Sequence, residues 1–135
     1  MFVLDASALA KTFLDEDRSE ELRAWLDKAI AARETLLAPP LACSEVGRII
    51  QREMGLPPEE SAKLHDAVFI GVEVVAPAAF TDPWRQVRPG ITFYDAEYLA
   101  LAAERKATLA TADRAQLEGA RKAGLAARSF VPGVK

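Results

Sequence analysis

The sequence has only one cysteine and one histidine in 135 residues. Because Cys43 has no partner, no disulfide can form within the chain, and nothing points to an oxidising compartment. Because His65 stands alone, catalysis by a pair of histidines is excluded. Long apolar runs are also missing, since Asp5 interrupts the opening run at residues 2–4. We therefore expect no signal peptide, no transmembrane helix and a cytoplasmic protein.

Composition and charge predict one globular domain that is not strongly basic. Half of the residues are hydrophobic and 27% are charged, and the length suits a single domain over residues 1–135. The net charge of −3 argues against a general nucleic-acid binder, because such domains usually carry a basic patch. If four carboxylates bind metal and are left out of the sum, the net charge of the remaining groups is +1 instead of −3.

Short apolar segments alternate with segments of helical periodicity. Continuous apolar runs indicate strands that are buried on both faces. We predict strands at 2–4, 35–38, 72–75, 108–111 and 127–131. We predict helices at 8–14, 19–30, 41–54, 57–70, 80–87, 94–105 and 113–123, with Ile70 directed inward. This order predicts an α/β fold, a three-layer α/β/α sandwich with a central parallel sheet of four to five strands.

Four acidic residues lie where an open α/β sheet places its chemistry, at or just past the carboxyl ends of strands and in the helices that follow. Asp5 ends the first strand and Asp113 follows the fourth, while Glu45 and Asp95 lie in the first turns of their helices. Each aspartate could instead be a helix cap or complement a helix dipole, worth about 1 kcal/mol. Glu45 borders an apolar face, where an unpaired carboxylate is costly. A hard divalent cation, which prefers oxygen ligands, is a suitable partner for all four.

The segments around these acids resemble a known family. Residues 2–9 (FVLDASAL), 42–46 (ACSEV), 94–102 (YDAEYLALA) and 108–114 (TLATADR) are similar to the acidic motifs of PIN domains, in particular VapC-type toxins of toxin–antitoxin pairs. The motifs occur in the family's order and spacing over nearly the whole chain, and the segment at 94–102 is fairly specific.

The resemblance implies an Mg²⁺- or Mn²⁺-dependent endoribonuclease. It also implies a homodimer, and a cognate antitoxin whose C-terminal segment lies in the active-site groove. Ser7 and Thr111 match small hydroxyl positions that, by analogy, hydrogen-bond the ligands or metal-bound water.

Our hypothesis assigns the chemistry to metal and not to a protein nucleophile. Asp5, Asp95 and Asp113 hold one Mg²⁺ or Mn²⁺ ion, and Glu45 completes its shell or serves a second ion. Three basic residues near these acids could contact RNA phosphates or an antitoxin carboxylate, or could be ordinary surface charges. They are Lys11, Arg48 and Arg114.

Other functions would need residues that this chain has only in part. A phosphatase of the haloacid dehalogenase type also begins with an aspartate after its first strand, but it needs a second one two residues later, where this chain has Ser7. A phospho-receiver domain needs an acidic pair that the chain lacks. A catalytically inactive PIN-fold binding module and a structure-specific DNA nuclease remain as alternatives.

Overall fold

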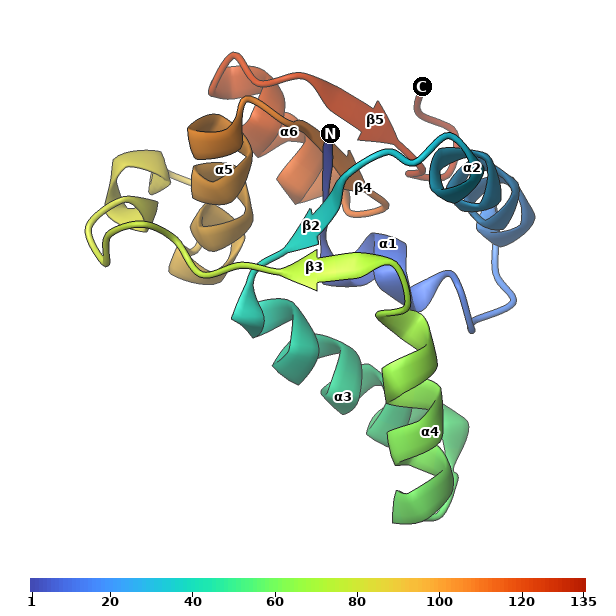
Figure 1. Cartoon of the computed structure of the whole chain (residues 1–135). Helices are drawn as coiled ribbons and strands as arrows, with labels where there is room; N and C mark the ends of the chain where they lie inside the picture. The colour runs from blue at the N-terminus through green and yellow to red at the C-terminus, as the bar shows by residue number, and fades with distance from the viewer.

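The computed structural model describes residues 1–135 and is built around one parallel sheet of five strands in the order β3-β2-β1-β4-β5 (Figure 1). The strands are β1 Phe2–Leu4, β2 Leu36–Ala38, β3 Val72–Val74, β4 Thr108–Thr111 and β5 Ala127–Ser129. The three central strands are almost wholly buried, as expected for apolar segments covered on both faces. The predicted parallel sheet is confirmed.

Helices cover both faces of this sheet. They are α1 Ala6–Ala10, α2 Ser19–Ala31, α3 Pro40–Met54, α4 Pro58–Val68, α5 Phe93–Arg105 and α6 Arg114–Lys122, with a 3-10 helix, η1, at Pro83–Gln86. The chain passes from β1 to β2 to β3 in one direction across the sheet, and then from β4 to β5 in the other. Right-handed crossovers therefore place α1, α3 and α4 on one side and α5 and α6 on the other (Figure 1). The three-layer sandwich is confirmed.

The chain crosses the sheet in one direction after β1 and in the other direction after β4. These two strands lie side by side, so a crevice forms between them. The two strands pair in parallel, with Leu4 opposite Ala110. Loops that leave adjacent strands toward opposite faces create a crevice at the carboxyl edge of the sheet. Asp5 and Asp113 lie just past the ends of these two strands.

Several elements differ from the predictions, since the helix predicted at 80–87 is reduced to η1 and the strand predicted at 127–131 ends at Ser129. The first helix runs from Ala6 to Ala10 instead of over 8–14, because the side chain of Asp5 caps its N-terminus. Ile70, predicted to point inward, is 72% exposed. It follows the end of α4 at Val68 and lies in the turn before β3, where no layer covers it. None of the helices combines the length and the apolar character that a membrane crossing needs.

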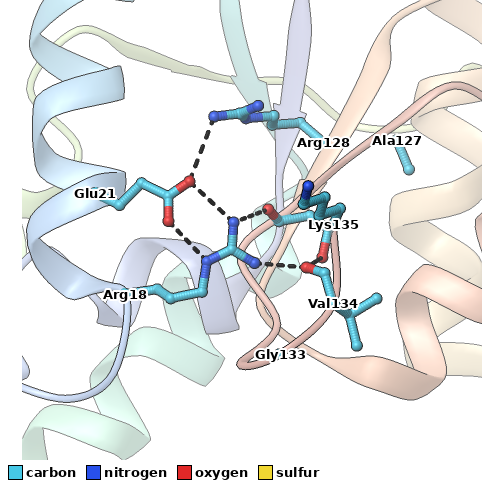
Figure 2. A pocket seen from close by; sticks show the side chains of 8 residues that line it. Arg18, Glu21, Ala127, Arg128, Gly133, Val134 and Lys135 are labelled. Carbon is cyan, nitrogen blue, oxygen red and sulfur yellow. Dashed lines mark hydrogen bonds and ion pairs between the residues drawn. The ribbon is translucent and has the colours of Figure 1, made fainter.

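Arg18 ties the start of α2 to the C-terminal segment (Figure 2). Its Nη1 atom donates hydrogen bonds to the carbonyl oxygens of Val131 and Val134 at 2.7 and 2.6 Å, and Nη2 donates to that of Ser129 at 2.9 Å. Its Nε and Nη2 atoms also hold the carboxylate of Glu21 at 2.8 and 2.9 Å. The residue has a left-handed backbone with φ 63°, which these contacts offset.

We predict that Arg18→Lys lowers the free energy of unfolding by about 2 kcal/mol. A lysine ammonium group cannot donate to the three carbonyl oxygens and the carboxylate at the same time, as the planar guanidinium group does. Arg33→Lys is the matched control: Arg33 also has positive φ, at 57°, but is exposed and has no side-chain hydrogen bond. Urea denaturation of both variants measures the difference. Equal stability of the two variants would contradict the role of Arg18.

Candidate metal centre

The four predicted acids line one small cavity at the carboxyl edge of the sheet. Its volume is about 80 Å³, enough for two or three water molecules. The residues that line it come from four separate segments of the chain. They are Asp5, Ala6, Ser7, Glu45, Asp95, Tyr98, Asp113 and Gln116. The structure thus brings together four acids that lie up to 108 residues apart in sequence.

Asp5 is the most buried of the four acids, with 4% of its surface exposed. Its Oδ1 atom accepts hydrogen bonds from Ser7 Oγ at 2.6 Å and from the backbone N–H of Ala8 at 2.9 Å. Its Oδ2 atom accepts a hydrogen bond from Thr111 Oγ1. Burial raises the pKa of Asp5 to about 6, since the three hydrogen bonds compensate only partly for lost hydration and the charge of Asp113 adds to the effect.

Ser7 and Thr111 also connect the loop after β4 to α1. The backbone N–H of Ala112 donates to Ser7 Oγ at 2.9 Å, and that of Asp113 donates to Thr111 Oγ1 at 3.0 Å. The two hydroxyl groups therefore orient Asp5 and the backbone of Asp113 together.

Asp95 and Asp113 open two neighbouring helices. Asp113 is the N-cap of α6, where its Oδ1 atom accepts from the backbone N–H of Gln116 at 2.8 Å. Asp95 lies in the first turn of α5. Its pKa is raised mainly by burial and also by the nearby negative charge of Asp113. Gln116 joins the two helices, because its Nε2 atom donates to the carbonyl oxygen of Asp95 at 3.2 Å.

Glu45 reaches the cavity from α3 and is held by an aromatic hydroxyl. Tyr98 OH donates to Glu45 Oε1 at 2.6 Å. Burial and the Glu45 carboxylate raise the pKa of Tyr98, so this phenol stays protonated and remains a donor. The adjacent Glu97 does not line the cavity, although burial and the charge of Glu45 raise its pKa.

No lysine, arginine or histidine forms an ion pair with any of the four acids. Their negative charges are therefore balanced only by hydrogen bonds. Gathered carboxylates without a cation repel one another, and the raised pKa values of Asp5 and Asp95 reflect this repulsion in addition to burial.

The donor set fits a hard divalent cation, although the side chains do not form a finished coordination shell. No three acidic, histidine or cysteine side chains stand close enough together to hold a metal ion. The hydrogen bonds to Ser7, Thr111, Tyr98 and the backbone hold several of the carboxylate oxygens. A further oxygen of this cavity wall, Gln116 Oε1, is buried and has no hydrogen-bond partner. A buried acceptor without a partner favours a cation or its water in the cavity.

The three predicted basic contacts differ in their placement. Lys11 is 3% exposed, and its ammonium donates to Glu16 Oε1 at 3.1 Å and to the carbonyl oxygen of Asp17 at 2.6 Å. This burial contradicts the prediction of a surface contact, and Lys11 instead holds the loop after α1. Arg48 and Arg114 are exposed and have no side-chain partner, so their role as contacts stays a prediction.

The sequence interpretation missed Tyr98 and Gln116 as residues of the site. Neither residue is among those that the sequence predicts for the site. A signal was present in the spacing, since each lies three residues after a predicted ligand, Asp95 or Asp113, and helical residues three apart share a face.

Comparison with known proteins gives a family match over most of the chain. A sequence model of the PIN domain family matches residues 2–122. No curated protein sequence matches the chain significantly. PAE2754 from Pyrobaculum aerophilum, a solved structure, is 30% identical, with 87% of this chain and 83% of that chain covered and a TM-score of 0.64.

Two other solved structures share the fold at lower identity. FitAcB from Neisseria gonorrhoeae is 18% identical, with 94% of this chain and 96% of that chain covered and a TM-score of 0.70. VapC20 from Mycobacterium tuberculosis, a toxin that cleaves the sarcin–ricin loop, is 14% identical, with 87% and 94% covered and a TM-score of 0.66.

The raised pKa of Asp5 predicts a pH-dependent cost in stability for the metal-free protein. The folded state binds the proton of Asp5 more tightly than the unfolded state, whose pKa is 3.8, so this contribution is favourable below pH 4 and is lost as pH rises through about 6. The full loss, from below pH 3 to pH 7, amounts to about 3 kcal/mol, and most of it falls between pH 4 and 7. Asp5→Asn does not undergo this loss, so it gains stability relative to the wild type over that range.

Urea denaturation in EDTA at several pH values measures this difference. Asp27→Asn, which alters an exposed acid of α2 without side-chain partners, is the control and should follow the wild type. If the curves of wild type and Asp5→Asn run parallel from pH 4 to 7, the buried carboxyl titrates normally and the prediction is wrong.

Proposed function

The chain belongs to the PIN domain family, a family of nucleases, and from this premise we propose that it is a metal-dependent endoribonuclease. Residues 1–135 act as one PIN domain. The observation that supports the proposal most strongly is the convergence of four carboxylates, without any basic partner, on one cavity at the switch point of the sheet.

Asp5, Glu45, Asp95 and Asp113 would hold Mg²⁺ or Mn²⁺ in part through bridging water, because no three of these side chains stand close enough together to bind an ion directly. When bound, the cation would supply positive charge that activates a water molecule as the nucleophile and neutralises charge on the phosphodiester. Ser7 and Thr111 keep Asp5 oriented, and Gln116 keeps the starts of α5 and α6 together. The Ser7 hydroxyl group donates to Asp5 and accepts from the backbone N–H of Ala112, and we assign it the role of orienting these two groups.

RNA as the substrate is proposed from the family motifs, and the VapC20 fold is consistent with it. The same motifs support a toxin that a cognate antitoxin keeps inactive in the cytoplasm. Arg48 and Arg114 are exposed, and we propose them as contacts to RNA phosphates or to a carboxylate of the antitoxin.

We predict that the purified protein cleaves RNA in the presence of Mg²⁺ or Mn²⁺ and that EDTA abolishes cleavage. Asp5→Asn and Asp113→Asn should each lower the rate at least about a hundredfold, because a ligand carboxylate becomes a neutral amide. Total RNA and single-stranded DNA are assayed in parallel, with circular dichroism as a check of folding.

Glu118→Gln is the matched control, because Glu118 is an exposed acid on α6 without an ion pair and should be dispensable. Full activity of Asp5→Asn or Asp113→Asn would remove the proposed metal site. Absence of metal-dependent cleavage of any nucleic acid by the wild type would favour an inactive binding module, and cleavage of DNA alone would favour a DNA nuclease.

We also propose a homodimer. Phe80 and Trp84 are exposed aromatic residues near η1, Trp84 contacts the ring of Phe93 at the start of α5, and we propose that a second copy covers this region. Light scattering after gel filtration should give twice the mass of the 14.7-kDa chain. Trp84→Asp, in an exposed position, should shift the mass toward the monomer, and a monomeric wild type would refute the assignment.

A further inference from the structure

We infer that Tyr98 is a positioning residue of this site, whose hydroxyl group fixes the carboxylate of Glu45 for metal binding. The inference rests on the proposed function, because it concerns the same cavity. Tyr98 lies on α5, three residues after Asp95, and both side chains line the cavity. The hydroxyl group donates to Glu45 Oε1 at 2.6 Å, a short hydrogen bond typical of a charged acceptor.

This hydrogen bond is the only side-chain partner of Glu45. The carboxylate forms no ion pair and accepts no other hydrogen bond, and its Oε2 atom has no partner in the chain. A glutamate side chain has three rotatable bonds, so without an anchor it samples many orientations. Tyr98 restricts these orientations by holding Glu45 Oε1, and it leaves Glu45 Oε2 available to a metal ion.

Burial makes Tyr98 a reliable anchor. Only 2% of its surface is exposed, so core packing determines where its ring lies. The fixed ring keeps the hydroxyl group beside the Glu45 carboxylate, to which it donates its hydrogen.

The hydrogen bond also joins the two helical layers at the site. Glu45 comes from α3 on one side of the sheet, and Tyr98 comes from α5 on the other, with β1 ending between them (Figure 1). Glu45 is the only one of the four acids that comes from α3, and Tyr98 holds it from the opposite layer.

The test compares Mn²⁺ binding by calorimetry in the wild type, Tyr98→Phe and Tyr94→Phe. Tyr98→Phe removes one oxygen and keeps the ring, and we expect its Mn²⁺ dissociation constant to rise about tenfold, the usual size of such an indirect effect. Tyr94 is the matched control, because it lies on the same helix, is 63% exposed and has no hydrogen bond. Tyr94→Phe should bind Mn²⁺ like the wild type.

A double-mutant cycle with Glu45→Ala shows whether Tyr98 acts through Glu45. Tyr98→Phe should weaken Mn²⁺ binding in the wild-type background and have no further effect in the Glu45→Ala background. The Mn²⁺ dependence of RNA cleavage should shift in the same way, with a smaller change in the rate at saturating Mn²⁺. Thermal unfolding in EDTA verifies that each variant is folded.

The outcomes separate this inference from the proposed function. If the wild type binds no Mn²⁺, the proposed metal site itself fails. If the wild type binds Mn²⁺ and loses that binding on Asp113→Asn, but Tyr98→Phe binds as tightly as the wild type, only the role of Tyr98 is refuted. An equal loss in both backgrounds of the cycle would also refute it, since Tyr98 would then act independently of Glu45.

Discussion

Repulsion between carboxylates is the constraint on which the site depends. Four acids face one cavity with no basic side chain among them, and one of the four is almost completely buried. A folded protein tolerates this arrangement only where the charges are solvated by fixed dipoles or neutralised by a bound cation. Here hydroxyl groups and backbone N–H groups supply the fixed dipoles, and a deficit of positive charge remains, which is the reason for proposing a small, hard cation at this site.

Hydrogen bonds from the surrounding residues hold the four acids in place despite their mutual repulsion. Pairing of β1 with β4 brings Asp5 beside Thr111, and Ser7 then bridges from α1 to the loop after β4. Gln116 adds a cross-link between α5 and α6. Each support is a short polar side chain or a backbone group attached to a rigid element. The acids are therefore held by the fold and not by one another, as a site prepared for an added ion requires.

The sheet and the four acids could be predicted from the sequence, because both follow from local rules. Apolar runs indicate buried strands, and polar residues just after such runs mark the carboxyl edge of a parallel sheet. The resemblance to the PIN domain family is confirmed by the match over residues 2–122. The hydrogen-bond partners could not be predicted in the same way. Tyr98 is an amphipathic residue whose polar end points to a distant segment, and no local pattern shows whether such an end reaches solvent or a buried partner.

The order of the strands has a consequence for biosynthesis. β1 is translated first, but its neighbour β4 ends at Thr111, and the last acid of the cavity is Asp113. Until the polypeptide has been extended past that point and has left the ribosome exit tunnel, Asp5 has no hydroxyl group of Thr111 beside it and the pocket has one wall missing. A chain of this topology therefore cannot assemble its four acids before residue 113 has been synthesised, and any chemistry of the cavity has to wait for that point.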